Sequence, residues 1–421
     1  MLRIFKNFLF QNHSSLQTLV KNTLWLGLIE FFSKIILFFV TILIVRSFGP
    51  DNFGKYNLAF SYAAFVLVFS SLGLDVVVTR ETAKHPEQIN KFLCNTLSIK
   101  IIVSLILFLI SLLIKPLLND DPFIQKLFLL CIVYSLLQNI SSLFISVFYG
   151  LEKMEYIFAS KLFYYLGILF SAILITANNS TPDKLLFLYI AASVISLVFT
   201  IILILVNKIK ISLSFDFDFW KKTLKESLPL LGMAILTVIY LNNDTILIAH
   251  FFGSEKVGFY QSAYKVLFAF QSINIINTVL FPRFSIFFHQ KKYSSLNKLI
   301  RFTSLISFVV LIPLAILITI FSKSIINIIY GSTYTSASLT MVLLVWSGVI
   351  CYYRTYVSNL LIASNHQRIY FWIFLIGVFV NLILNIFLSS RFDYYFPALS
   401  LLISELIITI LGTIFYVRVK K

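Results

Sequence analysis

Charged side chains are scarce in this chain of 421 residues: 12% are Asp, Glu, Lys or Arg, whereas 59% are hydrophobic. A water-soluble globular protein carries about twice that charged fraction, so the composition argues against a soluble enzyme. Acidic residues are the scarcest, with 17 Asp and Glu against 34 Lys and Arg. Basic patches indicate nucleic-acid binding on an otherwise polar chain. This chain is apolar, so we expect no nucleic-acid partner and interpret the bases as a membrane-topology signal.

Cysteines and catalytic motifs are also few. Cys94, Cys131 and Cys351 lie far apart in apolar stretches, a pattern typical of small buried side chains rather than of a metal site. No GxxxxGK[ST] phosphate loop and no HExxH motif occurs, which argues against ATP hydrolysis and metalloprotease activity. Asp216-Phe217-Asp218 has DxD spacing, but its connection is too short for a nucleotide-binding domain. We therefore predict no enzyme activity, no cofactor and no metal site.

Long apolar segments dominate what is present. A bilayer core requires about 20 helical residues, and twelve segments of suitable length and low charge occur. They are 23–45, 56–77, 92–114, 123–148, 157–177, 184–206, 228–251, 258–281, 302–321, 339–363, 369–389 and 394–417. No connection between them is long enough for an extramembrane domain. The sequence therefore predicts an all-α polytopic membrane protein with twelve transmembrane helices.

The distribution of Lys and Arg predicts the orientation of these helices. Of the 34 bases, 22 lie in the tails, connections and adjoining helix ends on one side, 8 lie in connections and helix ends on the other side, and four lie deep inside predicted helices. Because Lys and Arg accumulate on the cytoplasmic side, we expect both termini and the connection 207–227 to be cytoplasmic.

An internal repeat divides the chain. Residues Phe48–Ala59 and Phe252–Ala263 share the pattern F-G-x4-G-x-Y-x-x-A at an offset of 204, about half of the chain. The glycines suit a tight turn with positive φ between two helices. We predict two six-helix bundles, 1–206 and 228–421, joined by the linker 207–227. Both bundles enter the membrane in the same direction, and such parallel repeats bind substrate where the halves meet.

Several motifs resemble one family. Arg46–Tyr56 and Ser71–Glu81 are similar to the first helical hairpin of bacterial polysaccharide flippases. These proteins are the O-antigen and capsule repeat-unit translocases of the multidrug/oligosaccharidyl-lipid/polysaccharide exporter superfamily. Similar motifs of the second half are Asn243–Ile248, Gly258–Tyr260, Ala263–Lys265, Phe281–Arg283, Ile312–Ala315 and Tyr330–Tyr334. The likeness extends from about residue 20 to about residue 340.

The resemblance implies a V-shaped, pseudo-twofold transporter in the bacterial plasma (inner) membrane. Such a transporter moves undecaprenyl-diphosphate-linked oligosaccharides from the cytoplasmic to the outer leaflet by alternating access. Expected partners are the lipid-linked oligosaccharide, membrane lipids, and possible glycan polymerase and chain-length regulator proteins. Two alternatives stay open: a multidrug/cation antiporter of the same superfamily, and a polytopic surface-glycan polymerase. A polymerase normally requires a large external loop, which the sequence lacks.

Four bases inside predicted helices are candidate ligands for the diphosphate: Lys34, Lys100, Lys265 and Arg354. Each ionisable group at a helix centre costs about 2.5–3.5 kcal/mol, which makes it a functional candidate. Each also has a structural alternative. Lys34 can pair with Glu30 one turn away, Lys100 can extend to the cytoplasmic face, and Arg354 can form a buried salt bridge.

Three acids inside predicted helices, Glu30, Asp244 and Glu405, are candidates for coupling to an H+ or Na+ gradient. Asp244 and Lys265 lie at similar depths on neighbouring antiparallel helices. The sequence therefore predicts that they form an ion pair at rest, and the alternative is a cation site at Asp244 whose protonation Lys265 tunes. Asp75, near the inner end of the second predicted helix, is expected at the membrane interface.

Overall fold

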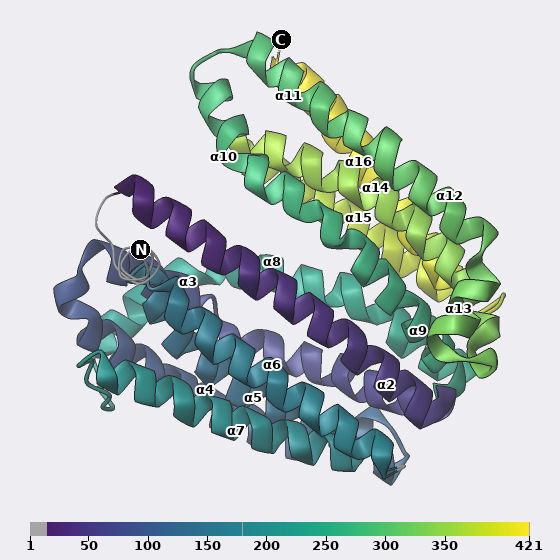
Figure 1. Ribbon diagram of the computed structural model, residues 1–421, viewed down its shortest axis with the longest axis horizontal. Coiled ribbons are helices and arrows are strands. Elements are labelled where there is room, and N and C mark those ends of the chain that lie inside the picture. The colour runs from purple at the N-terminus through teal and green to yellow at the C-terminus, as the bar shows by residue number, and fades with distance from the viewer. Residues whose placement is uncertain (1–14, 179, 421) are drawn as a thin grey trace, which may run out of the picture. The chain divides into compact units, whose positions relative to one another are not determined.

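The computed structural model describes residues 15–178 and 180–420, which form helices and no strands (Figure 1). Residue contacts divide the chain into two compact units. Unit 1 comprises Met1–Phe48 and Ala59–Val238, and unit 2 comprises Gly49–Leu58 and Ile239–Lys421. The predicted division into 1–206, 207–227 and 228–421 stays a prediction. In the contact-based division, residues 49–58 belong to unit 2, although they lie within the predicted first bundle.

Unit 1 is built mainly from seven helical segments. They are the two parts of α2 (Ser15–Ser71) outside residues 49–58, α3 (Leu74–Lys84), α4 (Ile89–Leu118), α5 (Pro122–Gly150), α6 (Met154–Ala177) and α7 (Pro182–Val206). A short 3₁₀ turn, Pro86–Gln88, joins α3 to α4. Helices α5 and α7 begin at Pro122 and Pro182, where the missing N–H of proline costs nothing. α5 packs against α3, α4 and α7.

The first helix of unit 2 begins in unit 1. It is α8 (Phe217–Phe252), and residues 239–252 belong to unit 2. The other segments are α9 (Ser254–Phe270), a 3₁₀ turn (Gln271–Asn274), α10 (Ile275–His289), α11 (Tyr293–Ile306), a π-helical turn (Ser307–Leu311), α12 (Ile312–Ile320), α13 (Ser322–Tyr330), a 3₁₀ helix (Ser332–Ala337), α14 (Ser338–Ala363), α15 (Gln367–Ser389) and α16 (Phe396–Lys420). α14 is central, because it packs against α9, α10, α12 and α16.

Ten stretches of the described residues are long and apolar enough to cross a membrane. The first, Val20–Lys84, has 65 residues and contains the predicted spans 23–45 and 56–77. The predicted span 258–281 falls on α9, the following 3₁₀ turn and α10, which are not among the ten. The chain is therefore a multi-pass, all-α membrane protein. The count of twelve is consistent with the structure and stays a prediction.

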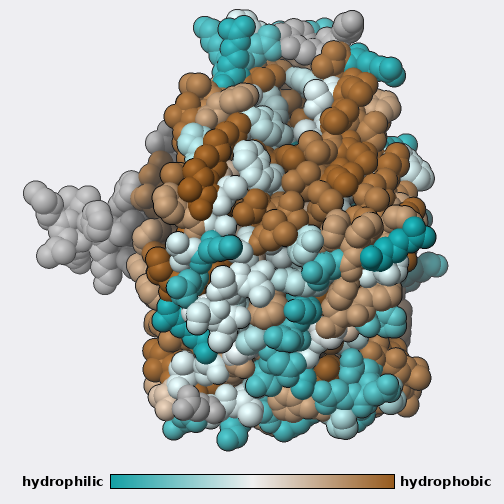
Figure 2. Space-filling view, turned by 90° about the vertical axis from the view of Figure 1, so that its right-hand side faces the viewer, coloured by the Kyte–Doolittle hydropathy of each residue, from teal (hydrophilic) through white to brown (hydrophobic). Residues whose placement is uncertain are grey.

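Large apolar side chains cover much of the outer surface, as expected for contact with lipid. Figure 2 shows broad brown areas on one face. Leu113 and Leu117 on α4 are 75% and 84% exposed, and many aliphatic and Phe residues of both units are exposed as well. A soluble protein rarely exposes contiguous apolar patches of this kind.

The two repeat motifs meet inside unit 2. Gly49 and Gly253 occupy equivalent positions and have φ values of 69° and 84°, as predicted, whereas the second glycine of each motif, Gly54 or Gly258, does not have a positive φ. Gly54 and Gly258, also equivalent, lie where α2 crosses the first turn of α9. A Cβ atom on Gly54 would lie 1.7 Å from the carbonyl oxygen of Ser254, and one on Gly258 would lie 1.9 Å from that of Pro50. The backbones therefore touch, and only glycine permits this distance.

Candidate functional site

An ion pair with a buried carboxylate joins α14 and α16 in unit 2. The Nε atom of Arg354 on α14 is 2.6 Å from Oε2 of Glu405 on α16, and Glu405 is 4% exposed. The hydroxyl of Tyr240 donates to Oε1 of Glu405 at 3.0 Å, and Nη1 of Arg354 donates to the Tyr370 hydroxyl at 3.0 Å. The structure thus gives Arg354 the salt bridge predicted as its structural alternative. Its role toward a diphosphate stays a prediction.

A second polar cluster surrounds Asp244 on α8, which is 2% exposed. The Tyr260 hydroxyl of α9 donates to one carboxylate oxygen, and the Asn385 amide of α15 donates to the other at 2.5 Å. Both partners are neutral. Asn243, the neighbour of Asp244, receives a hydrogen bond from Asn385 and donates one to Asn381 at 2.9 Å. The carboxyl is therefore buried and hydrogen-bonded, and no base among the described residues forms an ion pair with it.

The predicted ion pair between Asp244 and Lys265 is wrong. Lys265 makes no hydrogen bond or ion pair with any described residue, and Tyr260 occupies the position beside Asp244. Both the depth and the rotation differ from the prediction, because Lys265 lies about 7.5 Å along the axis of α9 from Tyr260, the residue that contacts Asp244. Tyr260 and Lys265 are five residues apart on α9, so their side chains point about 140° apart.

Sequence reasoning did not identify the neutral members of these clusters. They are Tyr240, Asn243, Tyr260, Tyr370, Asn381 and Asn385. A signal was present for two of them, because Asn381 and Asn385 stand one helical turn apart in an otherwise apolar predicted helix, 369–389.

In unit 1, Lys100 on α4 is completely enclosed, with 1% of its side chain exposed. Its ammonium group lies 2.6 Å from Oδ1 of Asp75 on α3 and donates to the Asn139 carbonyl oxygen at 2.8 Å. The Ser142 hydroxyl donates to the other Asp75 oxygen at 2.8 Å. Lys100 therefore does not extend to the surface as the sequence suggested; its charge is held inside the unit by Asp75.

A pocket of about 610 Å³ lies beside this pair. Asp75 and Ser142 line it, together with Tyr149 and two basic residues, Arg80 and Lys161. Lys100 is not among the lining residues, because Asp75 separates it from the pocket. The bases among the lining residues are thus Arg80 and Lys161, which the predicted orientation assigns to the cytoplasmic side.

Lys34, the other candidate base of unit 1, pairs with Glu30, as its structural alternative predicted. The Lys34 ammonium lies 3.5 Å from Glu30 one turn earlier, and these side chains are 34% and 50% exposed. The four candidate bases are thus divided, with Lys34 and Lys100 in unit 1 and Lys265 and Arg354 in unit 2. Their assembly around one diphosphate stays a prediction.

The DxD segment begins α8. The backbone N–H of Phe219 donates to the Asp216 carboxylate, as expected at a helix N-terminus, and Lys91 lies 3.3 Å away. These contacts, chiefly that of the Phe219 N–H, lower the pKa of Asp216. The described residues contain no group of three or more His, Cys, Asp or Glu side chains that could hold a metal ion.

Replacing Asp75 by Asn will destabilise unit 1 more than replacing its partner Lys100 by Met. The first change leaves a 1% exposed ammonium without a counter-charge, whereas the second leaves a carboxylate that is 31% exposed. Removing one partner of a buried pair costs about 3–5 kcal/mol. The matched control is Lys91→Met on the same helix. Its pair with Asp216 is exposed, so we expect a loss of about 0–1 kcal/mol. Denaturant unfolding of the purified variants checks this order, and equal losses for all three variants would contradict it.

The chain is similar to a known protein family and to several of its members. The family model described as "Polysaccharide biosynthesis protein" matches residues 19–288. The capsular polysaccharide biosynthesis protein CapF of Staphylococcus aureus is 22% identical over 95% of this chain and 100% of its own length. A putative O-antigen transporter of Escherichia coli is 21% identical over 94% of this chain and 96% of its own length.

Solved structures show the same fold. The inward closed conformation of the lipid II flippase MurJ superposes with a TM-score of 0.74, at 18% identity, over 94% of this chain and 87% of that one. An inward-facing multidrug resistance transporter of the MATE family and the MOP superfamily gives a TM-score of 0.69, at 12% identity, over 92% and 95% of the two chains. At these identities the likeness shows the fold alone.

Proposed function

Because the chain belongs to the polysaccharide biosynthesis protein family, we propose that it is a flippase for undecaprenyl-diphosphate-linked oligosaccharide repeat units. The family match confirms the resemblance inferred from the hairpin motifs. The observation that carries the proposal is that this match covers residues 19–288 of a chain with a transporter fold. The flippase moves its substrate from the cytoplasmic to the outer leaflet of a bacterial plasma membrane, for the synthesis of O-antigen or capsule, by alternating access.

The charges of unit 1 support a diphosphate substrate. Arg80 and Lys161 line one pocket of about 610 Å³, and Arg80 also pairs with Glu81 at 2.7 Å. Guanidinium and ammonium groups form charge-assisted hydrogen bonds with phosphate oxygens, and Arg can do so with two parallel bonds. The predicted orientation places both residues toward the cytoplasm, where the substrate is loaded. Lys100 acts indirectly in this proposal, because it fixes Asp75 at the edge of the pocket.

The buried acid of unit 2 supports coupling to an ion gradient. Asp244 is 2% exposed and its partners, Tyr260 and Asn385, are neutral. Ionisable residues in such positions mark proton and ion pathways in transporters. We propose that Asp244 takes up H+ or Na+ during the cycle. The same observation favours the alternative function, a multidrug/cation antiporter.

Loss of the gene will separate the two functions. We expect a deletion strain to lose surface polysaccharide and to accumulate lipid-linked repeat units inside the cell, with unchanged resistance to cationic drugs. Unimpaired export in the deletion strain, or a drug-sensitive strain with normal export, would overturn the flippase proposal.

Complementation of that strain tests the phosphate-binding residues. Arg80→Gln combined with Lys161→Gln will reduce polysaccharide export at normal protein level by about tenfold or more, since charged hydrogen bonds are worth about 1.5–3 kcal/mol each. The control is Lys84→Gln on α3, whose side chain is 59% exposed and does not line the pocket. Equal export by both variants would remove this pocket from the mechanism.

A further inference from the structure

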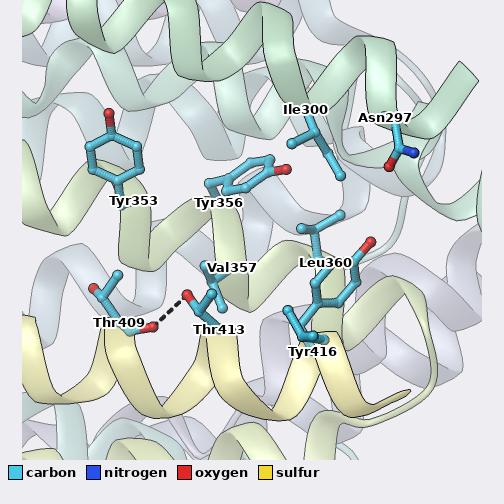
Figure 3. A pocket seen from close by; sticks show the side chains of 10 residues that line it. Asn297, Ile300, Tyr353, Tyr356, Val357, Leu360, Thr409, Thr413 and Tyr416 are labelled. Atoms are coloured by element: carbon cyan, nitrogen blue, oxygen red, sulfur yellow. Dashed lines mark hydrogen bonds between the residues drawn. The ribbon is translucent and has the colours of Figure 1, made fainter. Parts of the chain in front are cut away.

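Hydroxyl side chains on membrane-spanning helices often bond to their own helix, because lipid offers no other partner. The uncharged pocket of about 600 Å³ between α11, α14 and α16 shows this behaviour (Figure 3). There the Thr413 hydroxyl donates to the Thr409 carbonyl oxygen at 2.7 Å. The first turns of α4 differ, because their polar side chains accept hydrogen bonds from a distant segment, the linker between α7 and α8. These side chains are Asn90, Cys94, Asn95 and Ser98.

The non-helical residues 209–216 of the linker carry the donors at alternate positions. The backbone N–H groups donate in the pairs Lys210 to Asn90 at 2.9 Å, Ser212 to Cys94 at 3.3 Å, Ser214 to Ser98 at 3.0 Å and Asp216 to Asn95 at 2.8 Å. From the first pair to the third, four linker residues accompany eight residues of α4. An extended chain covers about 13 Å in four residues, and a helix about 12 Å in eight. The linker therefore runs extended along α4 as far as Ser98, and then turns back toward Asn95.

This course carries the linker into the predicted membrane. The predicted span 92–114 falls on α4, so Ser98 lies six residues, or about 9 Å, inside it along the helix axis. Non-helical backbone occurs at such a depth only where protein satisfies its polar groups. The polar side chains of α4 meet this requirement, because they accept from four successive inward-directed N–H groups of the linker.

The odd-numbered side chains of the linker form one apolar row. Ile209 is buried in the core of unit 1, and Ile211 packs against that core. Leu213, Phe215 and Phe217 continue the row outside the core and are 55%, 56% and 72% exposed. Three large apolar side chains in a row are unfavourable in water but suit the hydrocarbon region of a bilayer.

Exposed bases stand on both sides of this row. They are Lys208, Lys210, Lys221, Lys222 and Lys225, and none of them forms an ion pair within the described part of the chain. Asp216, an acid of the same segment, already pairs with Lys91 at 3.3 Å. Clustered lysines attract anionic lipid headgroups, and tryptophan favours the membrane interface. Trp220 fits this position, since its indole N–H donates to Asn95 at 3.3 Å.

We propose that residues 209–217, the linker loop, dock into the cytoplasmic leaflet of the membrane. Leu213, Phe215 and Phe217 insert among the acyl chains, and the flanking lysines bind anionic headgroups. Helix α4 holds the loop at this depth by supplying the acceptors that water would otherwise provide. The connection expected to be solvated is thus a lipid-binding element of unit 1. This inference concerns the linker alone and does not depend on the transported substrate.

Fluorescence quenching of the full-length protein in liposomes tests the insertion. The three natural cysteines are buried, so a single introduced cysteine can carry a bimane label. We expect labels at Leu213→Cys and Phe215→Cys to be quenched by lipids brominated in their acyl chains and to be protected from aqueous iodide. The matched control is Glu87→Cys between α3 and α4, whose side chain is 65% exposed. Its label should show the opposite pattern.

Quenching of the Leu213→Cys label by iodide but not by brominated lipid would overturn the inference. Protection from both quenchers would overturn it as well, because a protein surface, such as a second copy of this chain, would then cover the loop.

Asn95→Leu tests the role of α4. It removes the acceptor of the Asp216 N–H and of the Trp220 indole, so the label at Leu213→Cys should lose its protection from iodide. The control on the same helix is Ser111→Ala, because the Ser111 hydroxyl donates to the Leu107 carbonyl oxygen of α4 itself. A label that is unchanged by Asn95→Leu would overturn the anchoring by α4.

Native mass spectrometry tests the preference for anionic headgroups, with phosphatidylglycerol and phosphatidylcholine as ligands. Lys208→Gln combined with Lys210→Gln should reduce the preference for phosphatidylglycerol about tenfold. The control, Lys184→Gln with Lys323→Gln, removes two exposed bases of the predicted outer side and should leave the preference unchanged. Equal preference in all three proteins would overturn headgroup binding by the linker. The flippase proposal is tested separately, by polysaccharide export in the deletion strain.

Discussion

Replacing Arg354 by Met will lower the free energy of unfolding by about 3–5 kcal/mol, because Glu405 keeps its charge and loses its counter-charge in a buried site. Glu405 is 4% exposed, and its other side-chain partner is the Tyr240 hydroxyl, which cannot neutralise it. Denaturant unfolding in detergent measures the loss. The control is Arg391→Met in the same unit. Arg391 lies over the Phe387 ring, an interaction of about 0.5–1 kcal/mol at an exposed position.

A double variant separates structure from transport at this site. Arg354→Met with Glu405→Gln removes both charges and keeps an acceptor for Tyr240, so we expect most of the stability to return. Polysaccharide export by this variant then decides whether the pair takes part in transport. Absent export from a stable double variant shows that at least one of the two side chains takes part, and normal export shows that the pair is structural. A stable single Arg354→Met variant would contradict the ion-pair account itself.

Helix positions could be predicted closely because they depend on local composition. The predicted span 369–389 compares with α15 at Gln367–Ser389, and 339–363 compares with α14 at Ser338–Ala363. Each span is a long apolar run bounded by charged or small polar residues, and the cost of placing those in lipid defines its ends. The glycine turns were predictable for a related reason: the repeat aligns Gly49 with Gly253, and both have positive φ.

Pairing of the buried charges could not be predicted from the same information. It depends on the rotation of each helix and on its neighbours, and an apolar transmembrane sequence encodes both weakly. Lys100 was predicted to extend to the cytoplasmic face or to bind the diphosphate, yet its ammonium group pairs with Asp75 of α3. Asp244 was expected beside Lys265, yet its partners are Tyr260 and Asn385. Tyrosine and asparagine partners satisfy a buried charge without appearing in a count of charges, which is why the sequence missed them.

Substituting alanine for Gly54 or Gly258 will severely destabilise the protein. The new Cβ atom would lie 1.7 Å from the Ser254 carbonyl oxygen in the first case and 1.9 Å from that of Pro50 in the second. Both obstacles are backbone atoms, so no side-chain rotation relieves the clash, and α2 and α9 must separate. Overpacking of side chains costs about 1–3 kcal/mol. Because this clash involves backbone atoms, we expect a loss of about 3 kcal/mol or more in the free energy of unfolding. The fraction of monodisperse protein after extraction and its unfolding in detergent measure the effect.

Gly27→Ala supplies the control that distinguishes this clash from a general intolerance of alanine. Gly27 lies in α2, as Gly54 does, and a Cβ atom there meets nothing within 4 Å. Alanine stabilises a helix interior relative to glycine by about 0.5–1 kcal/mol, so this variant should be slightly more stable than wild type. The two glycines share one crossing, so the double variant Gly54→Ala/Gly258→Ala should lose less than the sum of the single losses. Additive losses, or a Gly54→Ala variant as stable as Gly27→Ala, would contradict a direct backbone contact between the two repeats.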